Sequence, residues 1–213
     1  MATSIPVNQL HIDTIELMTR MSPSLTSFFS VYIDKEYGGV KSSVDVNFLA
    51  YEAVLPGTSF ELGQVFGDRQ GITEQYPTKR VYPPIDVSFY VNVNGSQPYP
   101  VITFFENWMQ KIFELKGTDK NIRYGRFNYP STYETDIVIT KFERDYRDKS
   151  RRLLDKGTAG VPQINKKCTY TLRDAYPTNI ISLPVSYSQA DVLRTTITFN
   201  YDFYSYEDVT YTN

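Results

Sequence analysis

Few residues in this chain could do chemistry. His11 is the only histidine and Cys168 the only cysteine. A Ser-His-Asp or Cys-His nucleophilic system would have to use His11, which lies in a terminal segment beside no evident nucleophile. The sequence shows neither the His, Cys or carboxylate clusters of metal sites nor a glycine-rich phosphate loop. Its 24 Asp and Glu residues suit an ordinary surface and do not decide for or against a carboxylate pair for glycoside hydrolysis. We therefore predict no enzymatic activity, no catalytic or metal-binding residues, and no cofactor.

Net charge, cysteine content and hydropathy further restrict the class of protein that the sequence can encode. The formal net charge of −2 predicts no electrostatic grip on nucleic acid. A single cysteine excludes an internal disulfide, and Cys168 falls on the apolar side of a strand-like run, which predicts a buried structural thiol. No apolar run approaches the roughly 20 residues of a membrane helix, and residues 1–6 do not begin a secretory signal. We expect the protein to stay in the cytoplasm or to leave it as part of a particle.

Two alternating runs organise the C-terminal half. In residues 195–203 the apolar side chains of Ile197, Phe199, Tyr201 and Phe203 alternate with polar ones, and residues 168–172 alternate in the same way. A period of two predicts strands with one dry face and one wet face. Between the runs, in residues 175–180, Pro177 fixes its own φ and favours an extended conformation at Tyr176, and Asn179 is a residue that tolerates a turn.

The rest of the chain predicts more strands and one helix. Strands are expected over residues 25–33, 44–54, 60–66 (paired across the turn at 56–57), 85–93 and 135–144, with a turn at 35–39. Pro100 to Leu115 has apolar residues at helical spacing, and Gly117 follows as a stop. We predict a mainly β fold: an antiparallel two-sheet sandwich or barrel with one packed α-helix and long loops. Residues 1–213 would form one domain with an N-terminal arm (1–26), a long inter-strand loop (67–84) and a charged insertion (143–166).

The order of these motifs resembles that of a known family. An alternating strand is followed by Tyr176-Pro-Thr-Asn-Ile180, Leu183-Pro-Val-Ser186, an acidic turn residue at Asp191, and a last strand ending in Tyr201-Asp-Phe-Tyr204. Upstream, residues 46–57 resemble a strand closed by Leu-Pro, and residues 85–93 precede a helix carrying Phe105 and Trp108. In this order, over residues 45 to 206, the chain resembles the tail tube proteins of contractile, T4-like bacteriophages.

The resemblance implies a structural protein of the virion, assembled in the host cytoplasm. Subunits of that family form hexameric rings that stack into a tube inside a contractile sheath. DNA passes through the tube without specific binding. The implied partners are the protein itself and the sheath, tape measure and baseplate proteins, with no stable membrane insertion. The alternatives are a baseplate tube initiator, the tube of a contractile injection particle and, in another class, a small-ligand or sugar-binding β-barrel.

Two sets of residues are candidates for assembly. The resemblance implies that the segment 67–84 reaches adjacent subunits; the other interpretation is a solvated loop. Its interface candidates are Gly67, Asp68, Arg69, Glu74, Lys79, Arg80 and Tyr82. Polar positions on the wet strand faces are candidates for the lumen, or else ordinary solvent-facing residues: Ser88, Asn92, Thr169, Thr171, Thr196, Thr198, Asn200 and Asp202. The N-terminal arm and the insertion have two interpretations each, namely contact with a partner or local packing and solvation.

Overall fold

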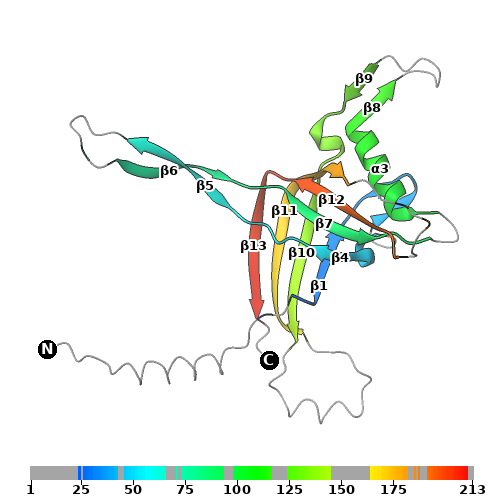
Figure 1. Ribbon diagram of the computed structural model, residues 1–213, viewed down its shortest axis with the longest axis horizontal. Helices are drawn as coiled ribbons and strands as arrows, with labels where there is room; N and C mark the ends of the chain where they lie inside the picture. Colours follow the sequence, from blue (N-terminus) through cyan, green and yellow to red (C-terminus); the bar gives the residue numbers. More distant parts are fainter. Residues whose placement is uncertain are drawn as a thin grey trace, which may run out of the picture.

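A computed structural model describes residues 24, 26–42, 46–65, 71, 73–93, 98–116, 124–144, 164–181, 185, 187 and 191–210. Its first sheet, sheet 1, has the strand order β1 (Phe29–Ile33), β10 (Thr135–Arg144), β11 (Ile164–Ile180) and β13 (Phe203–Thr210), with antiparallel pairing throughout. These strands lie side by side in Figure 1. The predicted strand 135–144 is confirmed with the same bounds as β10.

The second sheet, sheet 2, shares strand β11. From Tyr176 onward β11 pairs with β12 (Arg194–Asn200), which pairs with β7 (Ile85–Tyr90), which pairs with β4 (Ala50–Ala53). The extended conformation predicted for Tyr176 is confirmed, and Asn179 forms no turn, because the chain stays extended there and changes partners. Asp174 with φ 54° and a register shift between Pro177 and Asn179 bend the strand enough for Pro177 to be accommodated.

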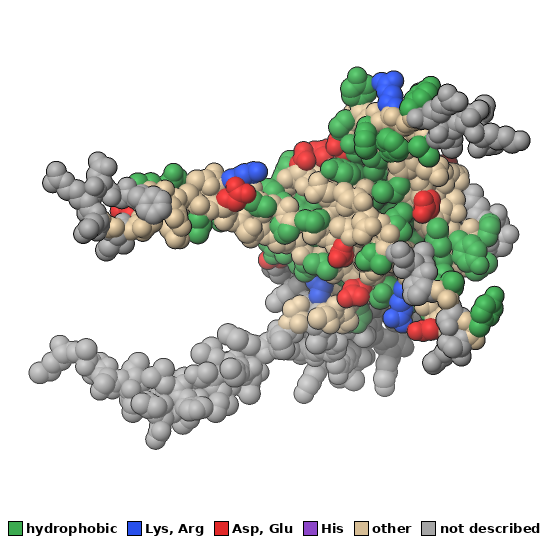
Figure 2. Space-filling model, turned by 45° about the horizontal axis from the view of Figure 1, so that its top comes forward, with side chains coloured by type: hydrophobic (Ala, Val, Ile, Leu, Met, Phe, Trp, Pro, Cys, Tyr) green, Lys and Arg blue, Asp and Glu red, His purple; other side chains and the backbone are tan. Residues whose placement is uncertain are grey.

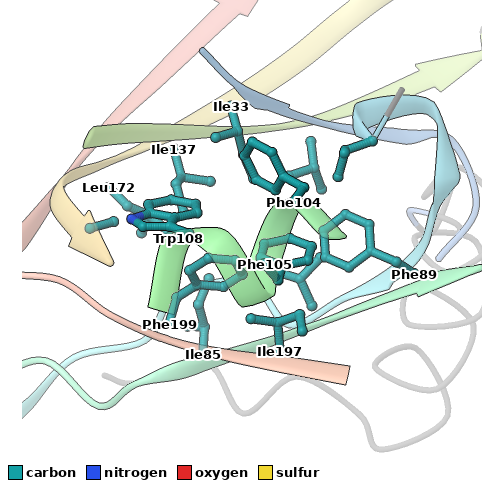
Figure 3. Close-up of a cluster of buried hydrophobic side chains, with 14 of the residues drawn as sticks. Ile33, Ile85, Phe89, Phe104, Phe105, Trp108, Ile137, Leu172, Ile197 and Phe199 are labelled. Atoms are coloured by element: carbon teal, nitrogen blue, oxygen red, sulfur yellow. The ribbon is translucent and has the colours of Figure 1, made fainter. Parts of the chain in front are cut away.

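Helix α3 (Pro100–Ile112) lies between the two sheets, as Figure 3 shows. Phe104 and Trp108 point toward Ile33 and Ile137 of sheet 1, whereas Phe105 packs on sheet 2 with ring centroids 5.1 Å from Phe89 and 6.0 Å from Phe199. All of these side chains are at most 1% exposed. The Trp108 indole N–H also donates to the carbonyl of Tyr133 at 2.8 Å, which satisfies its polar atom inside the core.

Three small elements complete the body of the protein. The predicted turn at 35–39 is confirmed as a hairpin of β2 (Glu36–Tyr37) and β3 (Val40–Lys41), with Gly38 and Gly39 at positive φ. Tyr37 stacks on Trp108 at 5.3 Å, and burial raises its pKa to about 12. The 3₁₀ turns η1 (Asn47–Leu49) and η2 (Pro130–Thr132) lie beside β1 and α3.

Two hairpins extend from this body. The first is the arm, formed by β5 (Ser59–Val65) and β6 (Glu74–Val81), which projects past β13 in Figure 1. The second is the upper hairpin, formed by β8 (Phe113–Lys116) and β9 (Tyr124–Phe127), which continues from the end of α3. The fold class is thus confirmed: mainly β, antiparallel, with one α-helix in the part of the chain that the structure describes.

Several predicted elements need correction. The loop predicted at 67–84 contains strand β6, which pairs with β5, so residues 60–66 do not pair across the turn at 56–57. The strand predicted over 44–54 begins as η1, and only Ala50–Ala53 is extended. The strand predicted from residue 25 begins at Phe29, after Phe28 at φ 64°. The helix ends at Ile112 because Phe113 pairs with Phe127 instead of continuing the helix.

Two side-chain predictions are also wrong. Phe203, expected on the dry face, is 47% exposed, because the chain turns at Tyr201–Asp202 between β12 and β13. Cys168 is only half-buried, so it is not the fully buried thiol that its strand face predicted. The N-terminal arm predicted for residues 1–26 lies almost wholly outside the described residues. The charged insertion does so from residue 145 to 163, between the ends of β10 and β11.

Candidate assembly surfaces

The outer face of sheet 1, on the side away from α3, is polar. Register places its side chains in two rows across the four strands, Ser30–Thr140–Thr169–Glu207 and Tyr32–Val138–Thr171–Ser205. The hydroxyls of Thr140 and Thr169 are 3.5 Å apart. Glu207 is the only charged residue in these rows. These two rows therefore present mainly hydroxyl groups. Farther along the same face, register places Lys167 in the row Phe142–Lys167–Val209 and Arg144 beside Ile164.

One cation at the end of this face is neutralised. Arg173 follows Thr171 along β11, and its guanidinium forms an ion pair with the Asp136 carboxylate. Glu134 is close to the same corner, where burial, followed by repulsion from Asp174 and Asp202, raises the pKa of its carboxyl group. The corner where β12 turns into β13 therefore has an acidic character.

The candidate wet-face residues do not lie on one surface. Thr169 and Thr171 are on the outer face of sheet 1, whereas Thr196, Thr198 and Asn200 are on sheet 2. The sheet 2 group forms its own hydrogen bonds: Thr198 donates to Asp86 at 2.7 Å and Asn200 to the Tyr176 hydroxyl at 2.9 Å. A single bore cannot be lined by both groups, because α3 lies between the sheets.

Two of the three remaining candidates have environments that alternation did not predict. Ser88 is only 6% exposed, and its hydroxyl is 2.8 Å from that of Thr196, so it is a buried residue rather than a wet one. Asn92 follows the end of β7, and its Oδ1 is buried without a hydrogen-bond partner in the described chain. Asp202 is exposed at the corner between β12 and β13.

The arm carries most of the interface candidates. Glu74, Lys79 and Arg80 are on β6, and Tyr82 is at the base of the arm. Gly67, Asp68 and Arg69 lie outside the described residues. Register places Phe60 and Leu62 on one face of the arm, each 58% exposed, and Tyr76 on the other face at 49%. Figure 2 shows hydrophobic side chains exposed along the arm.

The base of the arm is held by stacked rings. The Arg80 guanidinium lies 5.0 Å from the Tyr82 ring centroid and 5.8 Å from that of Tyr204 on β13. Tyr82 and Tyr204 are in edge contact at 5.6 Å, and Tyr204 also contacts Tyr170 at 5.8 Å. This cluster fixes the direction in which the arm leaves the β13 side of sheet 1.

The upper hairpin was missed by sequence reasoning. Its exposed apolar residues include Leu115 (57%), Tyr124 (67%) and Phe127 (71%), and Phe113 packs on Phe127 at 4.8 Å. The Phe113 ring also lies over Gly125, where an added Cβ would be only 2.0 Å from the ring. The run Tyr124-Gly-Arg-Phe127 has no apolar–polar alternation, and four residues are too few to separate a strand from a loop.

The described residues contain no group of three or more His, Cys, Asp or Glu side chains arranged to hold a metal ion. The lone histidine lies outside them. Over the same residues, no helix is long and apolar enough to cross a membrane. The same residues present exposed aromatic side chains, rows of hydroxyl groups on sheet 1, and the edge strands β1 and β13, which each pair with one described strand.

Solved structures share this architecture. One is the cap that terminates the tube of the anti-feeding prophage, with 15% identity, a TM-score of 0.54, and coverage of 89% of this chain and 93% of that one. Another comes from the sheath–tube complex of an extracellular contractile injection system, with 14% identity, a TM-score of 0.50, and coverage of 97% and 100%. At these identities the likeness shows the fold alone. No curated protein sequence matches the chain.

A family model gives the relationship directly. The model described as phage tail tube protein matches residues 19–207, which is most of the chain and includes both sheets, α3 and both hairpins. This match confirms the resemblance seen in the order of the sequence motifs. The chain therefore belongs to the phage tail tube protein family.

Proposed function

We propose that this protein is a structural subunit of the inner tube of a contractile tail, in which copies close into rings and the rings stack. The observation that carries the proposal is the form of sheet 1. Its outer face is polar, and its end strands β1 and β13 each pair with only one described strand. Open edges invite pairing with another chain, and closure into a ring removes them.

Strand direction suits such a ring. Because neighbours in sheet 1 are antiparallel, β1 and β13 at the two ends of a four-strand series run in opposite directions. Copies in a ring are related by rotation, so β13 of one copy would run antiparallel to β1 of the next. Sheet 2 and α3 cover the inner face of each sheet 1. In such a ring the outer face of sheet 1, which is the side away from α3, lines the lumen with its two rows of hydroxyl groups.

The arm supports contacts between copies. It leaves the body past the β13 edge, which is the edge where the next copy would sit (Figure 1). Its apolar face at Phe60 and Leu62 is exposed in the single chain. We infer that adjacent copies cover this face and that the arm helps to hold stacked rings together. Stacking of this kind is head-to-tail and does not close, so the product is a filament.

The character of the outer face suits passage of DNA without binding. Each Lys or Arg contact to phosphate would add salt-dependent affinity. The two hydroxyl rows contain no basic residue, and Arg173 is already paired with Asp136. The basic positions Lys167 and Arg144 lie at the end of the face farthest from Arg173. By family resemblance, the ring is hexameric, the tube lies in the virion after assembly in the host cytoplasm, and the sheath, tape measure and baseplate proteins are its partners.

Negative-stain electron microscopy of the concentrated protein tests this function. Rods are the expected result. Single rings that do not stack would favour a tube cap or a baseplate initiator, which would use the same lateral contact. A homogeneous monomer at every concentration would contradict the proposal and favour the small-ligand β-barrel. Rods do not distinguish a phage tube from the tube of an injection particle; the identity of the sheath that coats them would.

A further inference from the structure

The side chain of Asn47 occupies part of the edge of β1 that faces away from β10. Asn47 of η1 uses both halves of its amide on Ile33: the Ile33 N–H donates to Oδ1 at 3.1 Å, and Nδ2 donates to the Ile33 carbonyl at 3.0 Å. The same carbonyl also accepts the Ser42 hydroxyl at 2.6 Å. Asn47 therefore occupies the place that a neighbouring strand would take beside Ile33.

The remaining edge of β1 is short. In an antiparallel strand the N–H and C=O of one residue point to the same side, and successive residues alternate. Phe142 donates its N–H to Phe28 across the β10 side. Residues 28, 30 and 32 therefore face β10, while Phe29, Val31 and Ile33 face outward. With Ile33 occupied, Phe29 and Val31 are the outward positions of β1 that bond to no other described residue.

The same alternation can be followed across sheet 1 to β13. If residues 138, 140 and 142 of β10 face β1, then residues 137, 139 and 141 face residues 172, 170 and 168 of β11. Residues 169, 171 and 173 of β11 then face β13 at residues 207, 205 and 203. Tyr204, Tyr206 and Asp208 are left with their backbone groups pointing outward from β13.

We propose that Asn47 sets the register between copies, so that Val31 of one copy pairs with Tyr204 of the next and Phe29 pairs with Tyr206. This inference rests on the lateral contact of the proposed function. In this register, the residue opposite Ile33 is Asp202. Its N–H already donates to Arg173 at 3.1 Å, and it precedes β13, so it needs no partner there.

Other registers fail on stated grounds. A slip of one residue would join the α3 side of one copy's sheet to the polar side of the next, and outward backbone groups would no longer be opposite each other. A slip of two in one direction would place Tyr204 opposite Ile33, where the Asn47 amide already lies. A slip of two in the other direction would leave Tyr206 and Asp208 opposite no outward-facing residue of β1. The proposed register keeps both open positions of β1 paired, with Tyr204 and Tyr206 on the same face as Val31 and Phe29.

Cysteine cross-linking in a Cys168→Ser background tests the register. Ser30 and Ser205 would be opposite each other across the contact, as a pair without backbone hydrogen bonds and about 4.5 Å apart between Cα atoms. Such a pair suits a disulfide. We expect S30C/S205C to give intermolecular disulfides in assembled protein at least about tenfold faster than S30C/E207C, which is two residues out of register. Equal rates, or a faster S30C/E207C, would overturn the register.

The same experiments distinguish a failure of the proposed register from a failure of the proposed tube function. If microscopy shows rings but neither cysteine pair links, the contact does not use β1 and β13, and this inference is wrong while the tube function stands. If no variant assembles and the wild-type protein is also a monomer, the proposed function fails and this inference fails with it.

The role of Asn47 needs its own variant. N47A frees the Ile33 edge, so the S30C/E207C rate should rise relative to that of S30C/S205C. The matched control is N128A, which also removes an amide-to-backbone hydrogen bond (Nδ2 to the Lys111 carbonyl, 2.7 Å) but lies away from the β1 edge. N128A should leave the ratio of rates unchanged. An unchanged ratio in N47A would show that Asn47 does not set the register, because loss of stability alone lowers both rates together.

Discussion

Large aromatic residues occur both in the core around α3 and on the two hairpins, but they are buried in the core and exposed on the hairpins. Phe104, Phe105 and Trp108 on α3 are at most 1% exposed and stack on one another and on both sheets. On the hairpins, Phe60 is 58% and Phe127 71% exposed. Burying a large apolar side chain stabilises a protein by roughly 1.5–3 kcal/mol, so the hairpin residues leave much of that free energy unrealised in the single chain.

The difference separates folding from assembly. The stability of the single chain resides where α3 is enclosed by two sheets. Among the described residues, the arm is held at its base by the Arg80–Tyr82–Tyr204 cluster. The upper hairpin is held by Phe113 packing on Phe127 and by the Asn128 side chain, which donates to the Lys111 carbonyl. Contiguous exposed apolar surface of this kind marks contact with other proteins. Substitutions in the two regions should therefore change different measurements.

The largest effect is expected in the core. Phe199 is fully buried and contacts Phe105 and Trp108 at 6.0 Å each. Phe199→Ala should lower the free energy of unfolding by about 3–5 kcal/mol, because it leaves a cavity under the helix. The matched change on a hairpin, Phe127→Ala, should cost less than about 1 kcal/mol. Thermal or urea unfolding of the unassembled protein measures both changes in the free energy of unfolding. Equal changes in the two variants would contradict the distinction between a core that stabilises the single chain and hairpins that do not.

Removing the outer part of the arm should leave the fold and abolish assembly. Replacing residues 61–79 with an Asn-Gly turn keeps the Phe60–Arg80 pair and the tyrosine cluster at the base. The melting temperature of the single chain should change by only a few degrees, since no core residue is lost. Microscopy should show no stacked tubes. Normal rods from this variant would mean that the arm is not needed for stacking.

A smaller effect is expected at Tyr201. Its side chain is 3% exposed, and its hydroxyl has no hydrogen-bond partner in the described chain. Removing an unpaired buried hydroxyl removes a desolvation penalty, so Tyr201→Phe should raise the free energy of unfolding by roughly 1 kcal/mol. A loss of that size would show that the hydroxyl is bonded in solution.

The same variant should change the response to alkali. Burial, followed by Tyr204 and Tyr82, raises the pKa of Tyr201 to about 12 from an ordinary value of 10.0. The folded chain therefore holds this proton above the pH at which the unfolded chain releases it. The contribution of this proton to the free energy of unfolding is fully present below pH 10 and is lost as the pH rises toward 12. The free energy of unfolding should therefore decrease less between pH 10 and pH 12 in Tyr201→Phe than in the wild type. Part of the decrease that remains in this variant should come from Tyr37, whose pKa is also raised to about 12.

The smallest expected effect is on DNA binding. A titration of assembled protein with DNA at low salt should show no tight binding, because the two hydroxyl rows of the outer face contain no basic residue and only Lys167 and Arg144 follow at one end of the face. Tight binding that weakens steeply as salt rises would show that the protein grips phosphates. In that case the outer face of sheet 1 would not be a passive wall.

Sequence patterns predicted the regular parts of the fold well. Strand β10 was bounded correctly by its alternation, and the position of α3 followed from its apolar spacing and Pro100. The resemblance then indicated the family. These features depend on local periodicity and on the order of motifs, both of which are visible in one chain.

The errors arose where distant contacts override local signals. Asn179 is a residue that tolerates a turn, but pairing with β12 keeps the chain extended there, and a bulge in β11 accommodates Pro177 opposite Phe199. Strand β6 contains Pro77 and mixed charges and gains its extended form from pairing with β5. The wet-face candidates were grouped because alternation reports which side of a strand is polar. It does not report which sheet the strand joins, and here Thr171 and Thr198 belong to different sheets.

Electron cryomicroscopy of the assembled protein, at a resolution that separates strands, tests the central claim most directly. We predict a closed ring in which β13 of each copy lies antiparallel to β1 of the next, with Thr169 and Thr171 facing the lumen and Thr196 and Thr198 outside it. A lumen lined by sheet 2, or a ring held together by the hairpins alone with β1 and β13 apart, would contradict the account.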